Sequence, residues 1–259
     1  MKKTYIPLLV MVLLLPAFAF SNTITFRLGY FIPRAGGGPD SLWNIEFENM
    51  SFKKTDFQES MIGFNYEYFL TKELSLAVSV DTYNKNKAGY YRDFVGYSFD
   101  EGDFAFPADV YRGEFTPAHS FNVSIVPIQF SLKLTPFGRR SRIIPFIGGG
   151  VGVYFWSVVL RGDMVDFSNV WEYEYEPGKF DDIYYIEPTN ARESNRLTFG
   201  YHAFGGIMFP IGNRLTLEAS VRYNVAKGKF RQGLDASFDG FEDFDLGGLV
   251  LAAGINYWF

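Results

Sequence analysis

The chain has 259 residues and no cysteine, so it can form no disulfide and cannot be a lipid-anchored lipoprotein. Its 29 acidic residues outnumber 24 basic ones, which argues against nucleic acid as a partner. Aromatic residues make up 19% of the sequence although the hydrophobic fraction is only 47%. This composition favours many alternating strands over long buried helices.

The first residues have the features of a secretion signal. Lys2 and Lys3 precede an apolar run over residues 6–15, and Ala17 and Ala19 supply the small side chains that a signal peptidase requires. We predict a signal peptide over residues 1–19, with cleavage after Ser21 as the alternative. A membrane anchor is disfavoured because the apolar run is shorter than the roughly 20 residues of a spanning helix. The mature chain is therefore expected to be exported.

Eight segments alternate large apolar residues with small or polar ones, as strands with one apolar face do. They cover residues 23–32, 61–70, 74–83, 121–135, 143–160, 197–209, 215–223 and 244–259. Within 121–135 the apolar residues change from odd to even positions, and we predict a β-bulge at Val126-Pro127 that restores the register. The connections are alternately long (33–60, 84–119, 161–195, 228–243) and short (71–73, 136–142, 211–214).

Short turns at one rim and long loops at the other are typical of an outer-membrane barrel. We therefore expect an all-β fold, an eight-stranded antiparallel up-and-down transmembrane β-barrel with short periplasmic turns and four long extracellular loops. The main alternative is a soluble, lipocalin-like barrel whose apolar faces point inward. Two aromatic girdles are expected, one near the long loops (Tyr30, Tyr83, Phe121, Phe155, Phe199) and one near the short turns (Phe69, Phe137, Phe209, Tyr257, Phe259).

The sequence resembles the small bacterial outer-membrane barrels of the OmpA, OmpX and OmpW type. The resemblance rests on the alternating strands, on PIQFSLKLTPF followed by IIPFIGGGVGVYF, and on the terminal NYWF. It implies one barrel domain over residues 20–259 in the outer membrane, in contact with the lipid bilayer and lipopolysaccharide. It also implies that Tyr257 and Phe259 form part of the signal read by the barrel-assembly machinery. Full-length OmpA proteins add a peptidoglycan-binding domain, and we expect the barrel alone here.

Polar residues on the inward faces are the first candidate site. They are Arg27, Asn65, Glu67, Asp81, Gln129, Lys133, His202, Glu218 and Arg222. Three of them are cations and three are carboxylates, and charges in a lumen this narrow need partners. We predict an ion-pair network that plugs the barrel. The alternative is a narrow channel for ions or small hydrophobic solutes.

The third long segment, residues 161–195, is the second candidate site. It holds nine acidic residues against three basic ones, and Trp171, Tyr173 and Tyr175 alternate with glutamates. Residues 183–186 can pair back on this stretch, so we expect the strands to continue beyond the membrane. Carboxylates among aromatic rings can bind a cation or a partner surface. The candidate residues are Glu172, Glu174, Glu176, Asp181 and Asp182, with the ligand unknown. The alternative is a solvated loop that packs on itself.

The two histidines limit the catalytic options. A lipid-A-modifying enzyme would need a serine, a histidine and an acid together on the lipid-facing surface. His202 is predicted to face inward, and His119 adjoins Ser120, whose side chain would point to the opposite face. We therefore expect no catalytic residues, no cofactor and no enzymatic activity. The expected role is structural, or an interaction at the cell surface through the loops.

Overall fold

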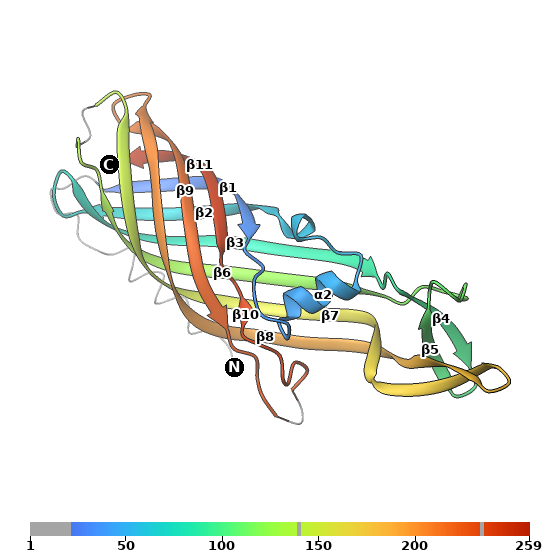
Figure 1. Ribbon diagram of the computed structural model, residues 1–259. Helices are drawn as coiled ribbons and strands as arrows, with labels where there is room; N and C mark the ends of the chain where they lie inside the picture. The colour runs from blue at the N-terminus through green and yellow to red at the C-terminus, as the bar shows by residue number, and fades with distance from the viewer. Residues whose placement is uncertain (1–21, 139–140, 234–235) are drawn as a thin grey trace, which may run out of the picture.

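The computed structural model describes residues 22–138, 141–233 and 236–259 (Figure 1). The predicted signal peptide, residues 1–19, lies outside these residues. In the described ranges no helix is long and apolar enough to cross a membrane.

Within the described residues, eight antiparallel strands close into a barrel (Figure 1). They are β1 (Thr23–Pro33), β2 (Glu59–Phe69), β3 (Leu74–Tyr90), β6 (Ala118–Leu134), β7 (Ile144–Glu176), β8 (Lys179–Pro210), β9 (Leu215–Gly228) and β11 (Gly248–Trp258). Each barrel strand pairs with the next one along the chain, and β1 pairs with β11 from Thr23↔Trp258 to Pro33↔Gly248. The predicted fold is confirmed.

The two rims differ as the sequence predicts. Short turns join β2 to β3, β6 to β7 and β8 to β9 at one rim. The first and last described residues meet at the same rim, where the backbone amide of Asn22 donates to the carbonyl of Phe259 at 3.0 Å. The long connections at the other rim contain the helix α2 (Leu42–Asn49), the 3₁₀-helix η1 (Lys54–Phe57) and the strands β4 (Phe94–Phe99), β5 (Gly102–Pro107) and β10 (Phe244–Asp245).

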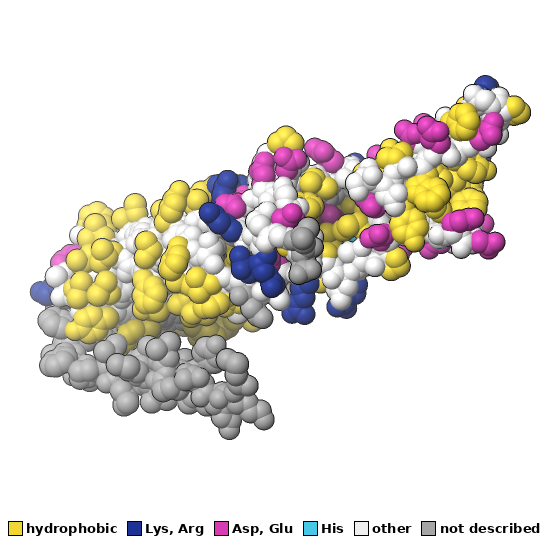
Figure 2. Space-filling model, turned by 90° about the horizontal axis from the view of Figure 1, so that it is seen from below, with side chains coloured by type: hydrophobic (Ala, Val, Ile, Leu, Met, Phe, Trp, Pro, Cys, Tyr) yellow, Lys and Arg dark blue, Asp and Glu magenta, His cyan; other side chains and the backbone are white. Residues whose placement is uncertain are grey.

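Apolar side chains cover the outside of the barrel wall. Ile62 is 50% exposed, Leu217 42% and Leu251 43%, and apolar side chains gather over the barrel end of the surface in Figure 2. On the same strands the charged side chains of Glu67, Glu218 and Arg222 point inward and are buried. This inside-out pattern excludes the soluble alternative, because a water-soluble barrel buries its apolar face. It is the pattern of a barrel that spans the bacterial outer membrane.

Strand β6 crosses two environments without changing register. The apolar residues Phe121, Val123 and Ile125 point inward and are buried. Further along the strand, the polar residues Gln129 and Lys133 also point inward and are buried. The pairing of β6 with β7 runs continuously from His119↔Gly162 to Leu134↔Ile147. The predicted bulge at Val126-Pro127 is therefore wrong. The apolar residues change parity because the interior changes from polar to apolar, not because the backbone slips.

The expected continuation of the strands through residues 161–195 is confirmed, because β7 and β8 form a hairpin up to a turn at Pro177-Gly178. Two further expectations are corrected. The final segment 244–259 is split into β10 and β11. Tyr83, Phe121 and Phe69 are buried inside the barrel and so belong to neither aromatic girdle.

A large apolar core fills the mouth of the barrel beneath the long connections. Trp43 of α2 lies near its centre, with ring centroids 5.1 Å from Phe57, 5.1 Å from Phe121 and 4.9 Å from Phe244. The indole nitrogen of Trp43 donates to the backbone carbonyl of Asp245 at 3.0 Å. Helix α2, which was not predicted, forms because packing around Trp43 holds it across the mouth.

Candidate functional site

The lumen contains an outer charged network on the side of the long connections. The Asp81 carboxylate lies between two guanidinium groups, 2.9 Å from Arg27 and 2.6 Å from Arg222. Arg222 also donates to the amide oxygen of Gln129, whose amide nitrogen donates to the Tyr154 hydroxyl at 2.9 Å. Asp81 is 4% exposed and both arginines are 7% exposed. Two cations thus share one carboxylate in a site that excludes bulk water.

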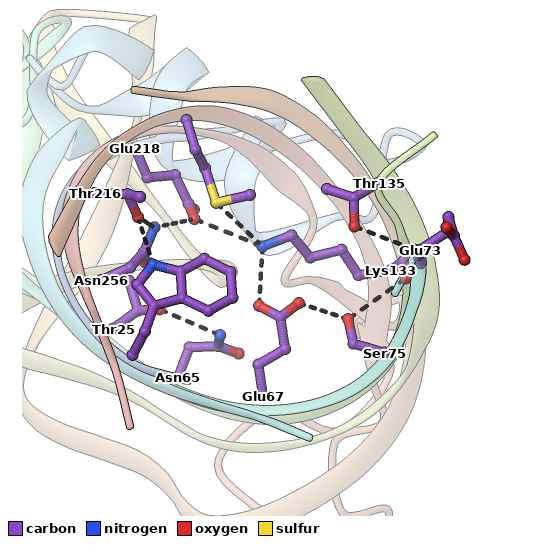
Figure 3. Close-up of polar contacts among 12 residues, drawn as sticks. Thr25, Asn65, Glu67, Glu73, Ser75, Lys133, Thr135, Thr216, Glu218 and Asn256 are labelled. Carbon is purple, nitrogen blue, oxygen red and sulfur yellow. Dashed lines mark hydrogen bonds and ion pairs between the residues drawn. The ribbon is translucent and has the colours of Figure 1, made fainter. Parts of the chain in front are cut away.

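An inner charged network lies closer to the short turns (Figure 3). The ammonium of Lys133 is 2.9 Å from the Glu67 carboxylate and 3.8 Å from that of Glu218. The hydroxyl of Ser75 donates to Glu67, and the amide nitrogen of Asn256 donates to Glu218 at 3.3 Å. Here one cation serves two carboxylates. The outer network has one cation in excess and the inner network one carboxylate in excess. The three cations and three carboxylates identified in the sequence therefore balance only over both networks together.

His202 faces the lumen but lies beside these ion pairs rather than within one. Its Nε2 atom is 2.8 Å from the Ser131 hydroxyl, and its ring stacks on Phe204 with centroids 5.9 Å apart. The sequence identified His202 as inward-facing without a partner. Its contacts assign it to packing of the inner barrel wall.

Glycines on β7 leave space in the lumen that large side chains of the barrel strands fill. A Cβ atom added at Gly148 would lie 2.4 Å from the ring of Phe204, and one at Gly152 would lie 3.1 Å from the ring of Tyr154. The remaining cavity beside Arg27 and Arg222 measures about 10 Å³, which is roughly the space of one water molecule. The lumen is therefore closely packed around its ion pairs.

A histidine and a glutamate pair within the apolar core at the mouth. The Nε2 atom of His119 on β6 lies 2.7 Å from the Glu46 carboxylate on α2, and both residues are 4% exposed. The His119 Nδ1 atom lies 3.3 Å from the backbone carbonyl of Asp163. The neighbouring Ser120 hydroxyl instead donates to the carbonyl of Arg161. Sequence reasoning missed this pair because nothing in it placed α2 over β6.

The long hairpin of β7 and β8 projects beyond the mouth together with β4 and β5 (Figure 1). We call β4, β5, residues 163–176 of β7 and residues 179–187 of β8 the arm. Strand β5 pairs with β8 through Phe104↔Tyr185. The arm has its own apolar cluster, in which Phe104 lies 5.3 Å from Trp171 and Phe106 lies 5.1 Å from Tyr173 between ring centroids.

A hydrogen bond fastens the connection after β5 to the arm. The Tyr111 hydroxyl donates to the Asp181 carboxylate at 2.7 Å. Burial, followed by this hydrogen bond to an anion, raises the pKa of Tyr111 to about 12. The tyrosine therefore stays neutral and able to donate at ordinary pH.

The acidic candidates of the arm separate onto two faces. Glu172 and Glu174 are exposed on one face, where Glu172 lies opposite Asp182, whereas Glu176 follows a register shift and lies opposite Lys179, whose Nζ atom is 2.6 Å from its carboxylate. Asp181 lies opposite Tyr173 on the aromatic face, so the five candidates do not form one cluster. In the described part of the chain, no group of three or more histidine, aspartate or glutamate side chains is arranged to hold a metal ion.

Tyr257 and Phe259 lie at the rim of the short turns. Both side chains are exposed, and their rings stack with centroids 6.4 Å apart. Their role in assembly remains a prediction of the family resemblance.

No protein-family model and no curated protein sequence matches the chain. Among solved structures it is similar to Neisserial surface protein A, with 10% identity, a TM-score of 0.44 and coverage of 95% of this chain and 100% of that one. It is also similar to outer membrane protein W of Escherichia coli, with 12% identity, a TM-score of 0.41 and coverage of 93% and 100%. These likenesses concern the fold alone. The closed eight-stranded barrel of the structure itself confirms, at the level of the fold, the resemblance inferred from the sequence.

One comparison corrects an expectation. The outer-membrane protease OmpT of Escherichia coli also matches, with 11% identity, a TM-score of 0.34 and coverage of 93% of this chain and 97% of that one. The expectation that the chain has no enzymatic activity is withdrawn.

Proposed function

We propose that this protein is a surface-interaction protein, in which the barrel is the membrane anchor and the arm is the contact surface. The observation that carries the proposal is the arm itself. It has a buried cluster of its own around Phe104, Phe106 and Ile183, so it holds its shape beyond the barrel wall. It also presents exposed aromatic rings beside exposed carboxylates (Figure 2).

Exposed aromatic rings distinguish the arm from an ordinary solvated loop. Trp171 is 48% exposed and Phe180 is 54% exposed, although water disfavours apolar surface. Aromatic residues are enriched where proteins bind each other, because a rigid ring buries a large area at a small entropic cost. The acidic residues beside them favour a partner of positive charge.

The packing of the lumen supports this role over that of a channel. A path for ions would have to pass the network around Asp81, the network around Lys133 and the apolar core around Trp43. Moving an ion through such a path would break buried ion pairs, at a cost of several kcal/mol for each charge left alone. Lipopolysaccharide and the assembly machinery remain predicted partners.

A shortened arm tests the proposal. Asp166 and Tyr185 are paired across the hairpin, so an Asn-Gly turn can replace residues 167–184 and close it. We expect the shortened protein, in nanodiscs of zwitterionic lipid, to bind immobilised polylysine about tenfold more weakly than the intact protein. Heat-modifiable gel mobility should show that the barrel still folds. Equal binding by both proteins would contradict the proposal.

Conductance provides the complementary test. In planar bilayers the intact protein should give no stepwise current, because its lumen is packed. Reproducible steps, lost when the protein is boiled, would support the channel alternative instead.

A further inference from the structure

One edge of the arm sheet is formed by β7, which in the arm has a neighbouring strand on one side only among the described strands. Pairing of β7 with β6 ends at His119↔Gly162, and beyond that point β7 pairs only with β8 among the described strands. The opposite edge, β4, is partly covered, because Gly96 exchanges backbone hydrogen bonds with residues 114 and 115. An uncovered strand edge presents unpaired N–H and C=O groups that can bind another strand.

The free edge has a regular chemical pattern. After an irregularity between Asp166 and Val170, β7 continues in regular pairing with β8 to Glu174. Alternate side chains point to opposite faces of a strand. Glu172 and Glu174 therefore lie on one face of the edge, whereas Trp171 and Tyr173 lie on the other. All four are exposed.

This pattern disfavours a second copy of the chain as the occupant. If two β7 edges paired in antiparallel fashion about a twofold axis, their glutamate faces would lie on the same side of the joined sheet. Like charges directly opposite each other across strands are destabilising. The occupant must instead carry positive charge on alternate residues.

We propose that the free edge of β7 binds an extended, basic segment of another protein as an added strand of the arm sheet. This inference rests on the proposed function and specifies its partner. Backbone hydrogen bonds to β7 hold the segment, lysine or arginine side chains face Glu172 and Glu174, and apolar residues between them lie against the aromatic face. Added strands are commonly recognised in this way, with the backbone supplying affinity and alternate side chains supplying specificity.

Labelled synthetic peptides test the geometry directly. The probe is a peptide of four Lys-Val repeats, with a Glu-Val peptide as control, and binding to the intact protein in zwitterionic nanodiscs is measured by fluorescence anisotropy. Two further probes carry backbone N-methyl groups on all lysines or on all valines. Successive N–H groups of a strand point to opposite edges, so only one of the two methylated peptides has its methyl groups on the side that faces β7. That peptide should bind on the order of tenfold more weakly, whereas the other should bind as well as the unmodified peptide.

Charge reversal on the edge provides the second arm of the test. Glu172→Lys and Glu174→Lys together should abolish binding of the Lys-Val peptide and create binding of the Glu-Val peptide. The matched control reverses Asp100 and Asp109, which are exposed acids away from the β7 edge. This control should leave both affinities unchanged within about twofold.

The outcomes separate this inference from the proposed function. If the two methylated peptides bind equally well or equally poorly, strand addition is wrong, whether or not the arm is the contact surface. If the control variant weakens binding as much as the edge variant, the edge is not the site. If the shortened arm still binds polylysine, the proposed function fails as well.

Discussion

The membrane half and the extracellular half of β6 follow opposite rules on one continuous strand. In the membrane half, Phe130 and Leu132 point outward while Lys133 points inward to an ion pair. In the extracellular half, Phe121 points inward to an apolar core and Asn122 points outward. The backbone pairing is the same in both halves.

The difference shows that the surroundings decide which side chains a strand turns inward. Lipid surrounds the membrane half, so apolar side chains face outward and the polar ones must satisfy each other inside. Water surrounds the extracellular half, so apolar side chains face inward, as in a soluble protein. Each half can be tested by a substitution that would be harmless in the other.

The largest effect is expected for the ion pairs of the membrane half. Asp81→Ala leaves Arg27 and Arg222 buried without a carboxylate between them. We expect a loss of about 3–5 kcal/mol in the free energy of unfolding. The measurement is urea unfolding in lipid vesicles, followed by heat-modifiable gel mobility.

Thr82→Ala is the matched control, because Thr82 is the next residue on β3 and is exposed. It should change the free energy of unfolding by less than about 0.5 kcal/mol. Similar losses for both variants would mean that the lumen charges do not hold the membrane half together.

The second test compares two phenylalanines of β6. Phe121 is fully buried at the mouth, whereas Phe130 is 52% exposed on the lipid-facing wall. Phe121→Ala should cost about 3–5 kcal/mol because it opens a cavity in the core. Phe130→Ala should cost less than half of that, since lipid tails fill the space it leaves. Equal losses in the free energy of unfolding in vesicles would contradict the conclusion that apolar side chains of β6 point outward in the membrane half and inward in the extracellular half.

Sequence periodicity predicted the membrane half well because its rule is simple. Outward apolar residues on strands of regular length, such as Leu217 and Leu251, produce a clear alternation. The extracellular half escaped prediction because its core is built from residues far apart in sequence. Trp43, Phe57 and Phe244 meet only in the folded chain.

A third, smaller effect is expected where α2 meets β6. Glu46→Gln removes the carboxylate from His119 and should cost about 1–3 kcal/mol, because the histidine is buried. The loss should be local. Hydrogen exchange measured by mass spectrometry should increase in α2 while the barrel strands below stay protected. Uniformly faster exchange throughout the barrel would show instead that α2 and the barrel unfold together.

The smallest effect is expected in the arm. Tyr111→Phe removes the hydrogen bond to Asp181 and should cost about 0.5–1.5 kcal/mol. The folded pKa of about 12 lies above the usual value of about 10. The neutral, donating tyrosine therefore stabilises the arm fully below about pH 10, and this contribution is lost as the pH rises to about 12.

Near-ultraviolet circular dichroism of the aromatic cluster can follow this loss. The difference between the wild-type and Tyr111→Phe spectra should stay constant up to about pH 10 and be about half lost near pH 12, where half of the Tyr111 side chains are ionised. A difference that is undiminished at the higher pH would show that the hydrogen bond does not hold this part of the arm.

Charge counting predicted the lumen residues but not their grouping. Equal numbers of cations and carboxylates indicated a neutral interior, yet the depth of each residue decides its partners. Arg27 and Arg222 share Asp81, whereas Lys133 alone serves Glu67 and Glu218. Similarly, alternation placed Glu172 and Glu174 on one face of the arm, but it could not show that β7 would lack a neighbour on one side.

Spin labels along β6 test most directly whether its apolar side chains change from outward-facing in the membrane half to inward-facing in the extracellular half. Because the chain has no cysteine, each introduced label is unique. Single cysteines at residues 120–134 would be labelled in lipid vesicles, and collisions with oxygen and with a water-soluble nickel complex measured. Even positions from 128 to 134 should favour oxygen, positions 122 and 124 should favour nickel, and odd positions should be shielded from both. Oxygen preference at every even position, or a phase change at residues 126 and 127, would contradict the account.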